Sequence, residues 1–526
     1  MPVTTIVKPG LYKDSVALMR ISEAAAALAG VRRAALVMGT AANKAILEEA
    51  GQLTADAQAA GPDDLVVVLE GESEQALADA SGRVEAMLAG EEAPRGGAAP
   101  EERPARALAT ALRRLADANL VLVSTPGAYA GAEALKALRR GLHVFLFSNN
   151  VPVEQEVHLK ALARRKGLLV MGPDCGTAII GGVPLGFANV VRRGGVGLVA
   201  AAGTGLQEVS CLIDRQGEGI SHGIGTGSND VSAPVGGATM QQGFEALRAD
   251  PATRVIVLVS KPPAPAVAAK MLGLVGTCEK PVVVLFLGGD PEPVRRAGAV
   301  PAVTLEDAAA AGVALARGEA PGPGEAAPLP DAERVRAEAA RLGRGQRYIR
   351  GLFSGGTLCT EAQVVWRERG IDAYSNVPLD AARRLGDPDE SREHTAVDMG
   401  TDEFTVGRPH PMIDFRYRVE RLRREARDPA TAVVLLDVVL GYGAHPDPAG
   451  ALVPAVREAR ALAEREGRHL SVVASVCGTE GDPQRLSAQE ARLREAGVLL
   501  LPSNAAAARA AVAIATRGAG PGEAGR

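Results

Sequence analysis

Short apolar runs recur along the chain, and most are followed by a segment whose apolar positions repeat with helical spacing. In the middle and last thirds these runs show no alternation of apolar and polar positions, as in NLVLVST, GVGLVAA, TRVIVLVS and TAVVLLDVV. Unbroken apolar strands are typical of parallel sheets that helices cover on both faces. The pattern therefore predicts doubly wound α/β blocks, with bounds near 107–190, 191–317 and 335–516.

The first part of the chain has a smaller pattern. Residues 1–90 read as a βαβαβα unit, and we predict a small α+β domain of ferredoxin-like type. Segments rich in Pro, Gly, Ala and charge at 91–106 and 317–334 indicate linkers. The tail at 517–526 has the composition of a disordered end.

Composition and charge exclude some functions. The net charge is −4 and no basic stripe is interleaved with aromatic residues, so nucleic-acid binding is disfavoured. No segment approaches the roughly 20 apolar residues that a membrane helix needs, and the N-terminus lacks a signal pattern, so we expect a cytoplasmic protein that binds no membrane. Five widely spaced cysteines without a CxxC pair favour reduced thiols over disulfides or zinc.

Glycine-rich clusters provide the first chemical indication. Several apolar runs end in Gly, Ser and Thr just before a helical segment, where unpaired N–H groups and the helix dipole attract phosphate or carboxylate. We predict that these junctions converge on an anion. The predicted binding residues are Gly203, Thr204, Gly205, Gly225, Thr226, Gly227, Ser228, Asn229, Ser354, Gly355, Gly356 and Thr357.

Further residues extend this candidate site. Gly441, Tyr442 and Gly443 form another glycine loop, and Cys477, Gly478 and Thr479 end a strand where a ligand could bind. His445 could act as a general acid or base near neutral pH, although loop histidines often only face solvent. For the stretch from Asp398 to Asp414, the polar, proline-rich sequence favours a structured loop or subunit contact over a metal site, and we predict no metal.

Residues 171–230 resemble the α subunit of succinyl-CoA ligase. The shared features are the MGPDCGTAII turn, the strand that leads into GTG at a helix start, and the following GIGTGSND loop. The last block resembles the carboxyl domain of the ligase β subunit. Together with GLFSGGTLCTEA at 351–362, this order is similar to the FdrA family of acyl-CoA synthetase homologues.

The resemblance implies a specific architecture: a Rossmann-like CoA-binding domain followed by two flavodoxin-like ligase domains, after the small N-terminal domain. It places Asn149, Asn150 and Cys175 on the side where CoA would bind. In the ligase pattern a glutamate at the position of Glu208 contacts the phosphohistidine, which makes Glu208 a candidate catalytic residue. Without that partner, Glu208 would be only a first-turn carboxylate that favours the helix dipole.

Two departures from the ligase pattern change the implied activity. Arg296 stands where the ligases have their phosphorylated histidine, and the chain has neither an ATP-grasp domain nor a GxxxxGK[ST] loop. The FdrA resemblance implies instead a component of a carbamoyl-transfer system, of the oxamate carbamoyltransferase type in allantoin catabolism. Such a component would bind phosphate and a small carboxylate and would assemble with itself and with separate partner subunits.

Two alternatives stay open. The first is an acyl-CoA ligase subunit that binds CoA and uses a separate nucleotide-binding partner. The second is a non-catalytic scaffold that binds metabolites. No GxSxG lies between a strand and a helix, and no GxGxxG is followed by an acidic residue at the right distance, so serine hydrolases and dinucleotide enzymes are disfavoured.

Overall fold

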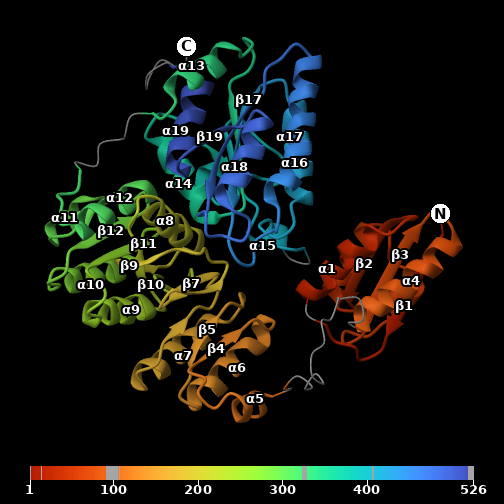
Figure 1. Cartoon of the computed structure of the whole chain (residues 1–526), viewed down its shortest axis with the longest axis horizontal. Coiled ribbons are helices and arrows are strands. Elements are labelled where there is room, and N and C mark those ends of the chain that lie inside the picture. Colours follow the sequence, from red (N-terminus) through yellow and green to blue (C-terminus); the bar gives the residue numbers. More distant parts are fainter. Residues whose placement is uncertain are drawn as a thin grey trace. The chain divides into compact units, whose positions relative to one another are not determined.

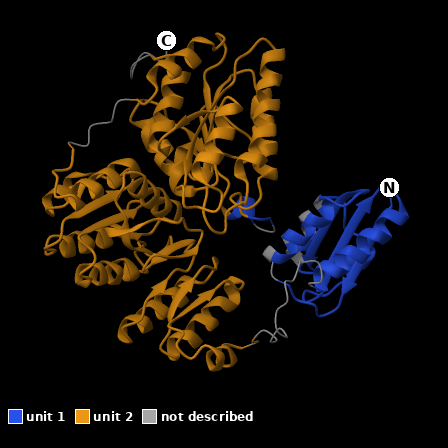
Figure 2. Cartoon of the chain, viewed as in Figure 1, with its two compact units in different colours: residues 1–104, 402–409 blue, residues 105–401, 410–526 orange. Residues whose placement is uncertain are grey.

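The computed structural model describes residues 2–13, 15–89, 105, 107–322, 329–405 and 408–518. Most of the linker predicted at 91–106, residues 323–328 of the second linker and most of the predicted tail lie outside the described residues. Figure 2 shows two compact units, one made of residues 1–104 with 402–409 and the other of residues 105–401 with 410–526.

The first unit contains a three-stranded antiparallel sheet in the order β1-β3-β2. Its central strand, LVVVLEG, is apolar on both faces: Leu65, Val67 and Leu69 pack toward α1 and α4, while Val66 and Val68 belong to a second cluster with α3. This is the split βαβ arrangement of ferredoxin-like domains. The elements are β1 (Val3–Lys8), α1 (Ser15–Ala26), β2 (Val31–Met38), α2 (Ala41–Glu49), α3 (Ala55–Ala59), β3 (Leu65–Gly71) and α4 (Glu74–Ala89).

The second unit begins with a small parallel sheet in the order β4-β5-β6. Its elements are α5 (Leu108–Arg114), β4 (Leu120–Val123), α6 (Gly127–Arg139), β5 (His143–Leu146), α7 (Val153–Arg165) and β6 (Val170–Met171). A hairpin of β7 (Thr177–Ile180) and β8 (Val183–Gly186) follows. We placed these residues with the block 107–190, but β7 pairs with β10, so the hairpin extends the next sheet.

That next sheet has the order β13-β12-β11-β9-β10-β7-β8, and its strands from β9 to β13 are parallel. Its elements are β9 (Arg193–Ala200), α8 (Gly203–Arg215), β10 (Ile220–Gly225), α9 (Ala238–Ala249), β11 (Val255–Ser260), α10 (Pro265–Val275), β12 (Val282–Phe286), α11 (Glu292–Arg296), β13 (Val300–Pro301) and α12 (Leu305–Ala316).

The last sheet is parallel throughout, in the order β15-β16-β14-β17-β18-β19. Its elements are α13 (Ala332–Ala340), β14 (Tyr348–Phe353), α14 (Gly356–Arg367), β15 (Tyr374–Ser375), η1 (Ala381–Arg383), β16 (Thr395–Asp398), α16 (Arg416–Arg427), β17 (Thr431–Val439), α17 (Pro448–Arg465), β18 (Ser471–Cys477), α18 (Leu486–Glu495), β19 (Leu499–Leu501) and α19 (Asn504–Ala515). Helix α15 (Asp402–Thr405) belongs to the first unit.

The two large sheets repeat one strand order. The series β13-β12-β11-β9-β10 corresponds to β19-β18-β17-β14-β16, so five strands of each sheet match in spatial order, while β7, β8 and β15 lie outside the match. In each, the first strand of the repeat, β9 or β14, lies at the point where the strand order reverses. Open α/β sheets bind ligands beyond the carboxyl ends of the strands at such a point.

One apolar core joins the two repeats. It includes buried residues of α8 and α12 from the first repeat and of α14 and α19 from the second, and these helices lie between the two sheets in Figure 1. The predicted fold class is confirmed: the molecule is an α/β protein with tandem parallel sheets and a small α+β domain. In the part of the chain that the structure describes, no helix has the length and apolar character needed to cross a bilayer.

Candidate functional site

The first turns of α8 and α14 face each other across the two repeats. A Cβ atom placed on Gly355 would lie 2.7 Å from Thr204 Cγ2, and one placed on Gly205 would lie 3.0 Å from Thr357 Cγ2. The start of each helix therefore packs against the threonine in the first turn of the other helix. Two of the predicted loops, at 203–205 and 354–357, are brought together by this contact.

Both helices begin without a side-chain cap, at Ala202 and at Gly355. Among the described residues, no acceptor contacts the N–H groups of Gly203, Thr204 and Gly205, or those of Gly356, Thr357 and Leu358. Unpaired first-turn N–H groups and the positive ends of two helix dipoles thus lie close to each other. This arrangement favours an anion.

Two of the predicted donors are already satisfied inside the protein. The Asp437 carboxylate accepts hydrogen bonds from the Ser354 N–H at 2.9 Å and from the Gly355 N–H at 2.8 Å, and the Ser354 hydroxyl donates to it. The buried Arg418 guanidinium lies 2.5 Å from the same carboxylate. Ser354 and Gly355 therefore shape the loop, and the donors left for a ligand begin at Gly356.

Charged side chains from several elements surround the start of α14. Asp398 ends β16 directly beside Gly356, where a Cβ atom would clash with its Oδ2. Burial raises the pKa of Asp398 to about 6, while the Gly400 N–H and the positive charge of Lys261, at the end of β11, act in the opposite direction. The sequence pattern did not predict Asp437 or Lys261 as site residues, and it predicted Asp398 only as part of a structured loop.

His410 borders the same region. A Cβ atom on Gly400 would lie 2.8 Å from His410 Nε2 and 3.2 Å from Asp398 Oδ1. The Nδ1 atom accepts a hydrogen bond from the Met412 N–H at 3.2 Å, which places the proton of the neutral ring on Nε2. Burial lowers the pKa of His410 to about 4, so the ring is neutral at physiological pH.

The loop Gly225–Asn229 packs against the turn at 172–177 instead of opening to a ligand. Cβ atoms on Gly225 and Gly227 would clash with the carbonyl oxygens of Thr177 and Pro173. The Thr226 N–H donates to the Ala200 carbonyl, Ser228 donates to Asp174, and Asn229 is exposed. This geometry does not support the prediction that the loop binds an anion, because its glycines serve close backbone packing.

The loop Gly441–Gly443 docks onto the segment that follows β8. The Gly441 N–H donates to Gln484, the Tyr442 N–H donates to the Ala188 carbonyl, and a Cβ atom on Gly443 would lie 2.9 Å from the Phe187 ring. Since these N–H groups already have acceptors, the predicted anion binding by the loop is not supported.

His445 lies further along the same loop, where its Nδ1 accepts from the Asp447 N–H and its ring packs edge-on against Phe415. The structure does not bring His445 and Glu208, the two predicted catalytic residues, together by any contact among the described residues.

Cys477, Gly478 and Thr479 form a joint between the repeats. The Thr479 hydroxyl donates to the Val190 carbonyl at 2.6 Å, and its N–H donates to Asp482. A Cβ atom on Gly478 would lie 2.7 Å from the Leu440 side chain. The neighbouring Cys211 thiol and burial raise the pKa of Cys477 well above its usual value, so the thiol is inert. The predicted ligand-binding role of these residues is not supported.

Glu208 is a buried structural carboxylate. Its Oε1 accepts a hydrogen bond from the N–H of Asn504, the first residue of α19, at 3.1 Å. Glu361 has the equivalent position on α14, and its Oε1 accepts from the N–H of Leu305, the first residue of α12, at 2.6 Å. Each glutamate thus stabilises a helix start in the opposite repeat. The catalytic role predicted for Glu208 finds no support in this geometry.

The residues predicted on the CoA side follow the strands of the small parallel sheet. Asn149 and Asn150 are exposed just after β5, and their carbonyl groups crowd the start of α6 at Gly127. Cys175 is buried, its thiol donates to the Thr177 carbonyl, and burial raises its pKa to about 12. The asparagines remain accessible to a ligand, whereas Cys175 belongs to the core.

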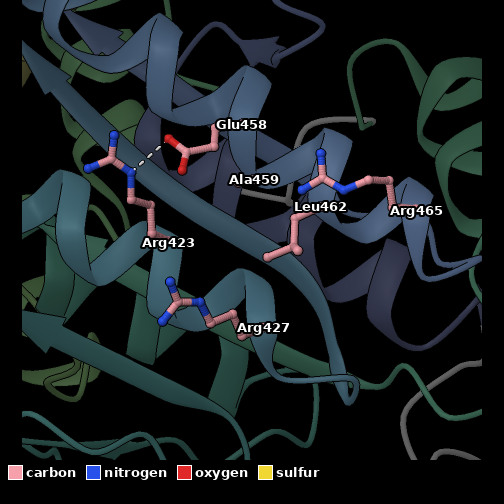
Figure 3. Close-up of a pocket in the computed structure, with 6 residues that line it drawn as sticks. All are labelled: Arg423, Arg427, Glu458, Ala459, Leu462 and Arg465. Atoms are coloured by element: carbon pink, nitrogen blue, oxygen red, sulfur yellow. Dashed lines mark hydrogen bonds and ion pairs between the residues drawn. The ribbon is translucent and has the colours of Figure 1, made fainter.

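A separate pocket lies between α16 and α17. It is lined by Arg423, Arg427, Glu458, Ala459, Leu462 and Arg465, and Figure 3 shows the Arg423 guanidinium pointing to Glu458. The Arg423 Nε donates to Glu458 Oε2 at 2.8 Å. None of the predicted site residues lines this pocket. Arg296, at the end of α11, is exposed.

Comparison with known proteins defines the class. The CoA-ligase family model matches residues 352–514, and the chain is 28% identical over 194 residues to the mitochondrial succinate–CoA ligase [ADP-forming] subunit alpha-2 of Trichomonas vaginalis. That alignment covers 35% of this chain and 60% of the relative. The fold and these matches make the protein CoA-ligase-like.

A full-length relative defines the family. The chain is 43% identical over 510 residues to the uncharacterized protein YahF of Escherichia coli K12, across 96% of this chain and 97% of YahF. The chain belongs to the family of YahF. Among solved structures, the dinucleotide-forming acetyl-coenzyme A synthetase 1 of Ca. Korarchaeum cryptofilum aligns with 76% of this chain and 83% of its own, at 16% identity and a TM-score of 0.32.

A third match concerns the first unit. Residues 1–104 match the family model described as the AllF, heavy metal-associated domain. This segment contains neither cysteine nor histidine, so it supplies no thiolate or imidazole for a metal. In the described part of the chain, no cluster of three or more His, Cys, Asp or Glu side chains is arranged to hold a metal. The domain therefore lacks the thiolate and imidazole ligands on which most heavy-metal sites depend.

Proposed function

We propose that the chain is an FdrA-type protein that binds an anion between the first turns of α8 and α14 and takes part in acyl or carbamoyl transfer between phosphate and a small carboxylate. One observation carries the proposal. The unpaired first-turn N–H groups of α8 and α14 lie close together, and each helix follows the strand, β9 or β14, at which the strand order of its sheet reverses. A tetrahedral phosphate accepts from several directions, which suits donors that come from two sides.

The environment of the donors supports a transfer reaction. Lys261 supplies a positive charge, Asp398 can exchange a proton, and the neutral His410 ring can donate a hydrogen bond through Nε2. Together these groups could neutralise charge that develops on a bound phosphoryl or carbonyl oxygen. We further propose that separate subunits complete the reaction, since the chain has no GxxxxGK[ST] nucleotide loop.

A second candidate is an acyl-CoA ligase subunit that relies on a separate nucleotide-binding partner. The CoA-ligase match over residues 352–514 favours it. The loops at the carboxyl ends of β4 and β5, with the exposed Asn149 and Asn150, offer a place for CoA.

Purification of the chain together with the products of neighbouring genes, followed by two assays, tests these functions. One assay measures phosphate-dependent cleavage of oxalurate-like ureido acids, and the other measures thioester formation from CoA, ATP and a small carboxylate. We expect activity in the first assay, with loss in Gly355→Val and retention in Gly345→Val, whose added atoms meet open space. Inactivity in both assays contradicts an enzymatic role, and full activity of the partners alone identifies this chain as a scaffold.

A further inference from the structure

We propose that Asp398 is the proton-carrying group of the anion site, so that a dianion binds there together with one proton taken up by this carboxyl group. The inference rests on the proposed anion site and adds the residue that controls its pH dependence.

The fold fixes Asp398 at the start of α14. Asp398 pairs with Phe353 in the register of β16 and β14, next to the loop that leads into the helix. The Asn376 side chain accepts from the Asp398 N–H at 3.0 Å and donates to its carbonyl at 2.9 Å, so the backbone is held on both sides. The backbone position of Asp398 is therefore set by the sheet and by Asn376.

The two carboxyl oxygens have different surroundings. Oδ1 accepts a hydrogen bond from the Gly400 N–H at 2.9 Å. Oδ2 lies beside Gly356, the first residue of α14, and the Gly400 N–H on Oδ1 is the one donor to this carboxyl group among the described residues. An anion that accepts hydrogen bonds from the first turn of α14 would thus meet Oδ2.

Charged and titratable groups from several surrounding elements act on Asp398, and the buried Cys359 thiol of α14, whose own pKa is raised chiefly by burial and further by Asp398, also lies near it. Asp437 on β17 and Asp174 in the turn after β6 disfavour its ionised form, whereas Lys261 after β11 favours it. His410 also faces Asp398, but it is neutral above about pH 4. Burial outweighs these charges and raises the pKa of Asp398 to about 6.

Because of this balance, binding of an anion is coupled to the uptake of a proton by Asp398. An ionised Asp398 repels a dianion at short range in a region of low dielectric constant, whereas a protonated Asp398 donates a hydrogen bond to it. At pH 8 the empty site holds Asp398 mostly ionised, so binding must draw a proton from solution. At pH 5 the proton is already present.

Sulfate is the appropriate probe, because it remains a dianion between about pH 5 and 8 while phosphate titrates in this range. We expect the wild-type chain to bind sulfate between about tenfold and a hundredfold more tightly at pH 5 than at pH 8, since each pH unit above the pKa costs up to tenfold. Calorimetry at pH 8 in two buffers of different ionisation enthalpy should show uptake of about one proton per bound sulfate.

Asp398→Asn should bind sulfate with little dependence on pH and without proton uptake, and the exposed Asp372→Asn serves as the matched control. Lys261→Gln should move the midpoint of the pH dependence upward and Asp174→Asn should move it downward, because these substitutions remove opposite charges. If Asp398→Asn does not fold, the proton uptake of the wild type and these two shifts still decide the matter.

The outcomes separate the two proposals. Sulfate binding that keeps the same pH dependence in Asp398→Asn, or wild-type binding without proton uptake, overturns the role of Asp398 but leaves the anion site intact. Failure of the wild type to bind sulfate at either pH overturns the anion site itself, and the role of Asp398 with it.

Discussion

Glycines at the two helix starts differ in how much space surrounds them. Gly355 approaches Thr204 so closely that a Cβ atom would lie between 2.7 and 3.0 Å from three of its atoms, whereas one on Gly203 would meet only Thr177 Oγ1 at 3.5 Å. Contacts under 3.0 Å force the neighbouring element to shift. A larger side chain at residue 355 would therefore push the two first turns apart, whereas a methyl group at residue 203 would leave their distance unchanged.

This difference gives a matched pair of variants. We expect Gly355→Val to abolish measurable sulfate binding and to lower the free energy of unfolding by about 1 to 3 kcal/mol, because α14 must move away from α8. Gly203→Ala should keep both properties near wild type. Calorimetric titration and urea unfolding measure the two effects, and unchanged sulfate affinity in Gly355→Val would contradict the convergent-helix site.

Buried carboxylates give the protein a pH-dependent stability. Burial raises the pKa of Glu361 to about 8, against 4.5 for the ordinary group. The folded state therefore binds more protons than the unfolded state between these values, and stability falls as the pH rises through this range.

We expect Glu361→Gln to remove part of this dependence. Titration of this group alone should lower the wild-type free energy of unfolding by roughly 1 to 3 kcal/mol between pH 6 and 9. Over the same pH range, the free energy of unfolding of Glu361→Gln should fall by less. Urea unfolding at both pH values tests the prediction, with Glu390→Gln, on an exposed turn, as the control. Equal drops in the variant and the wild type would show that Glu361 does not titrate in this range.

Local sequence predicted the glycine-rich helix starts but not the side chains around them. The loops at 203–205 and 354–357 were recognisable because apolar runs end there in Gly, Ser and Thr. Asp437 lies within the run TAVVLLDVV, Asp398 ends β16, and Lys261 follows β11. The pairing of β14 with β16 and β17 brings Asp437 to Ser354 and Gly355 and Asp398 to Gly356. Such proximity is a property of strand order, which local patterns do not encode.

At the scale of elements, a buried ion network holds the small parallel sheet against its neighbour. The Lys160 ammonium on α7 lies 2.6 Å from Glu156 and 2.7 Å from Asp230, and it also donates to the Thr226 carbonyl. Asp230 accepts in turn from the N–H groups of Thr239 and Met240 at the start of α9. One ammonium group thus links α7, the loop after β10 and α9.

Removal of this ammonium should be costly. We expect Lys160→Met to lower the free energy of unfolding by about 3 to 5 kcal/mol, because two buried carboxylates lose their counter-charge. The exposed Lys166→Met, at the C-terminal cap of the same helix, should change stability little. Thermal and urea unfolding compare the variants, and a loss below about 1 kcal/mol in Lys160→Met would refute the importance of the network.

Sequence patterns were least informative for the last helix, α19. Helix α19, NAAAARAAVAIA, is buried on nearly every side and consists mostly of alanine. A helix that is enclosed all round has no polar face, so its sequence lacks the amphipathic period by which helices are recognised. Helices with one exposed face, such as α16 and α17, keep polar residues on that face and so show this period.

At the scale of the whole molecule, the two repeats are joined through the segment that follows β8. The Asp482 carboxylate of the second repeat accepts hydrogen bonds from the Asn189 side chain at 2.8 Å and the Val190 N–H at 2.7 Å. Asn189 also donates to the Leu440 carbonyl. These contacts hold the strand-connecting segment of one repeat against the loops of the other.

We expect Asp482→Ala to loosen this joint. Loss of the carboxylate leaves the buried N–H groups of Val190 and Thr479 unpaired, which should lower the free energy of unfolding by roughly 2 to 4 kcal/mol. Limited proteolysis should reveal faster cleavage between residues 186 and 193. Asp290→Asn, on an exposed turn, provides the comparison, and an unchanged cleavage pattern in Asp482→Ala would argue against the joint.

The repeated strand order has a consequence for assembly. Each half of the proposed anion cradle comes from a different repeat, yet both repeats belong to one polypeptide, so neither half can be produced in excess. Covalent tethering also replaces a second-order encounter by an intramolecular one, with effective concentrations that reach the millimolar range for short connections. The cradle should therefore persist at any dilution of the protein, unlike one assembled from two dissociable chains.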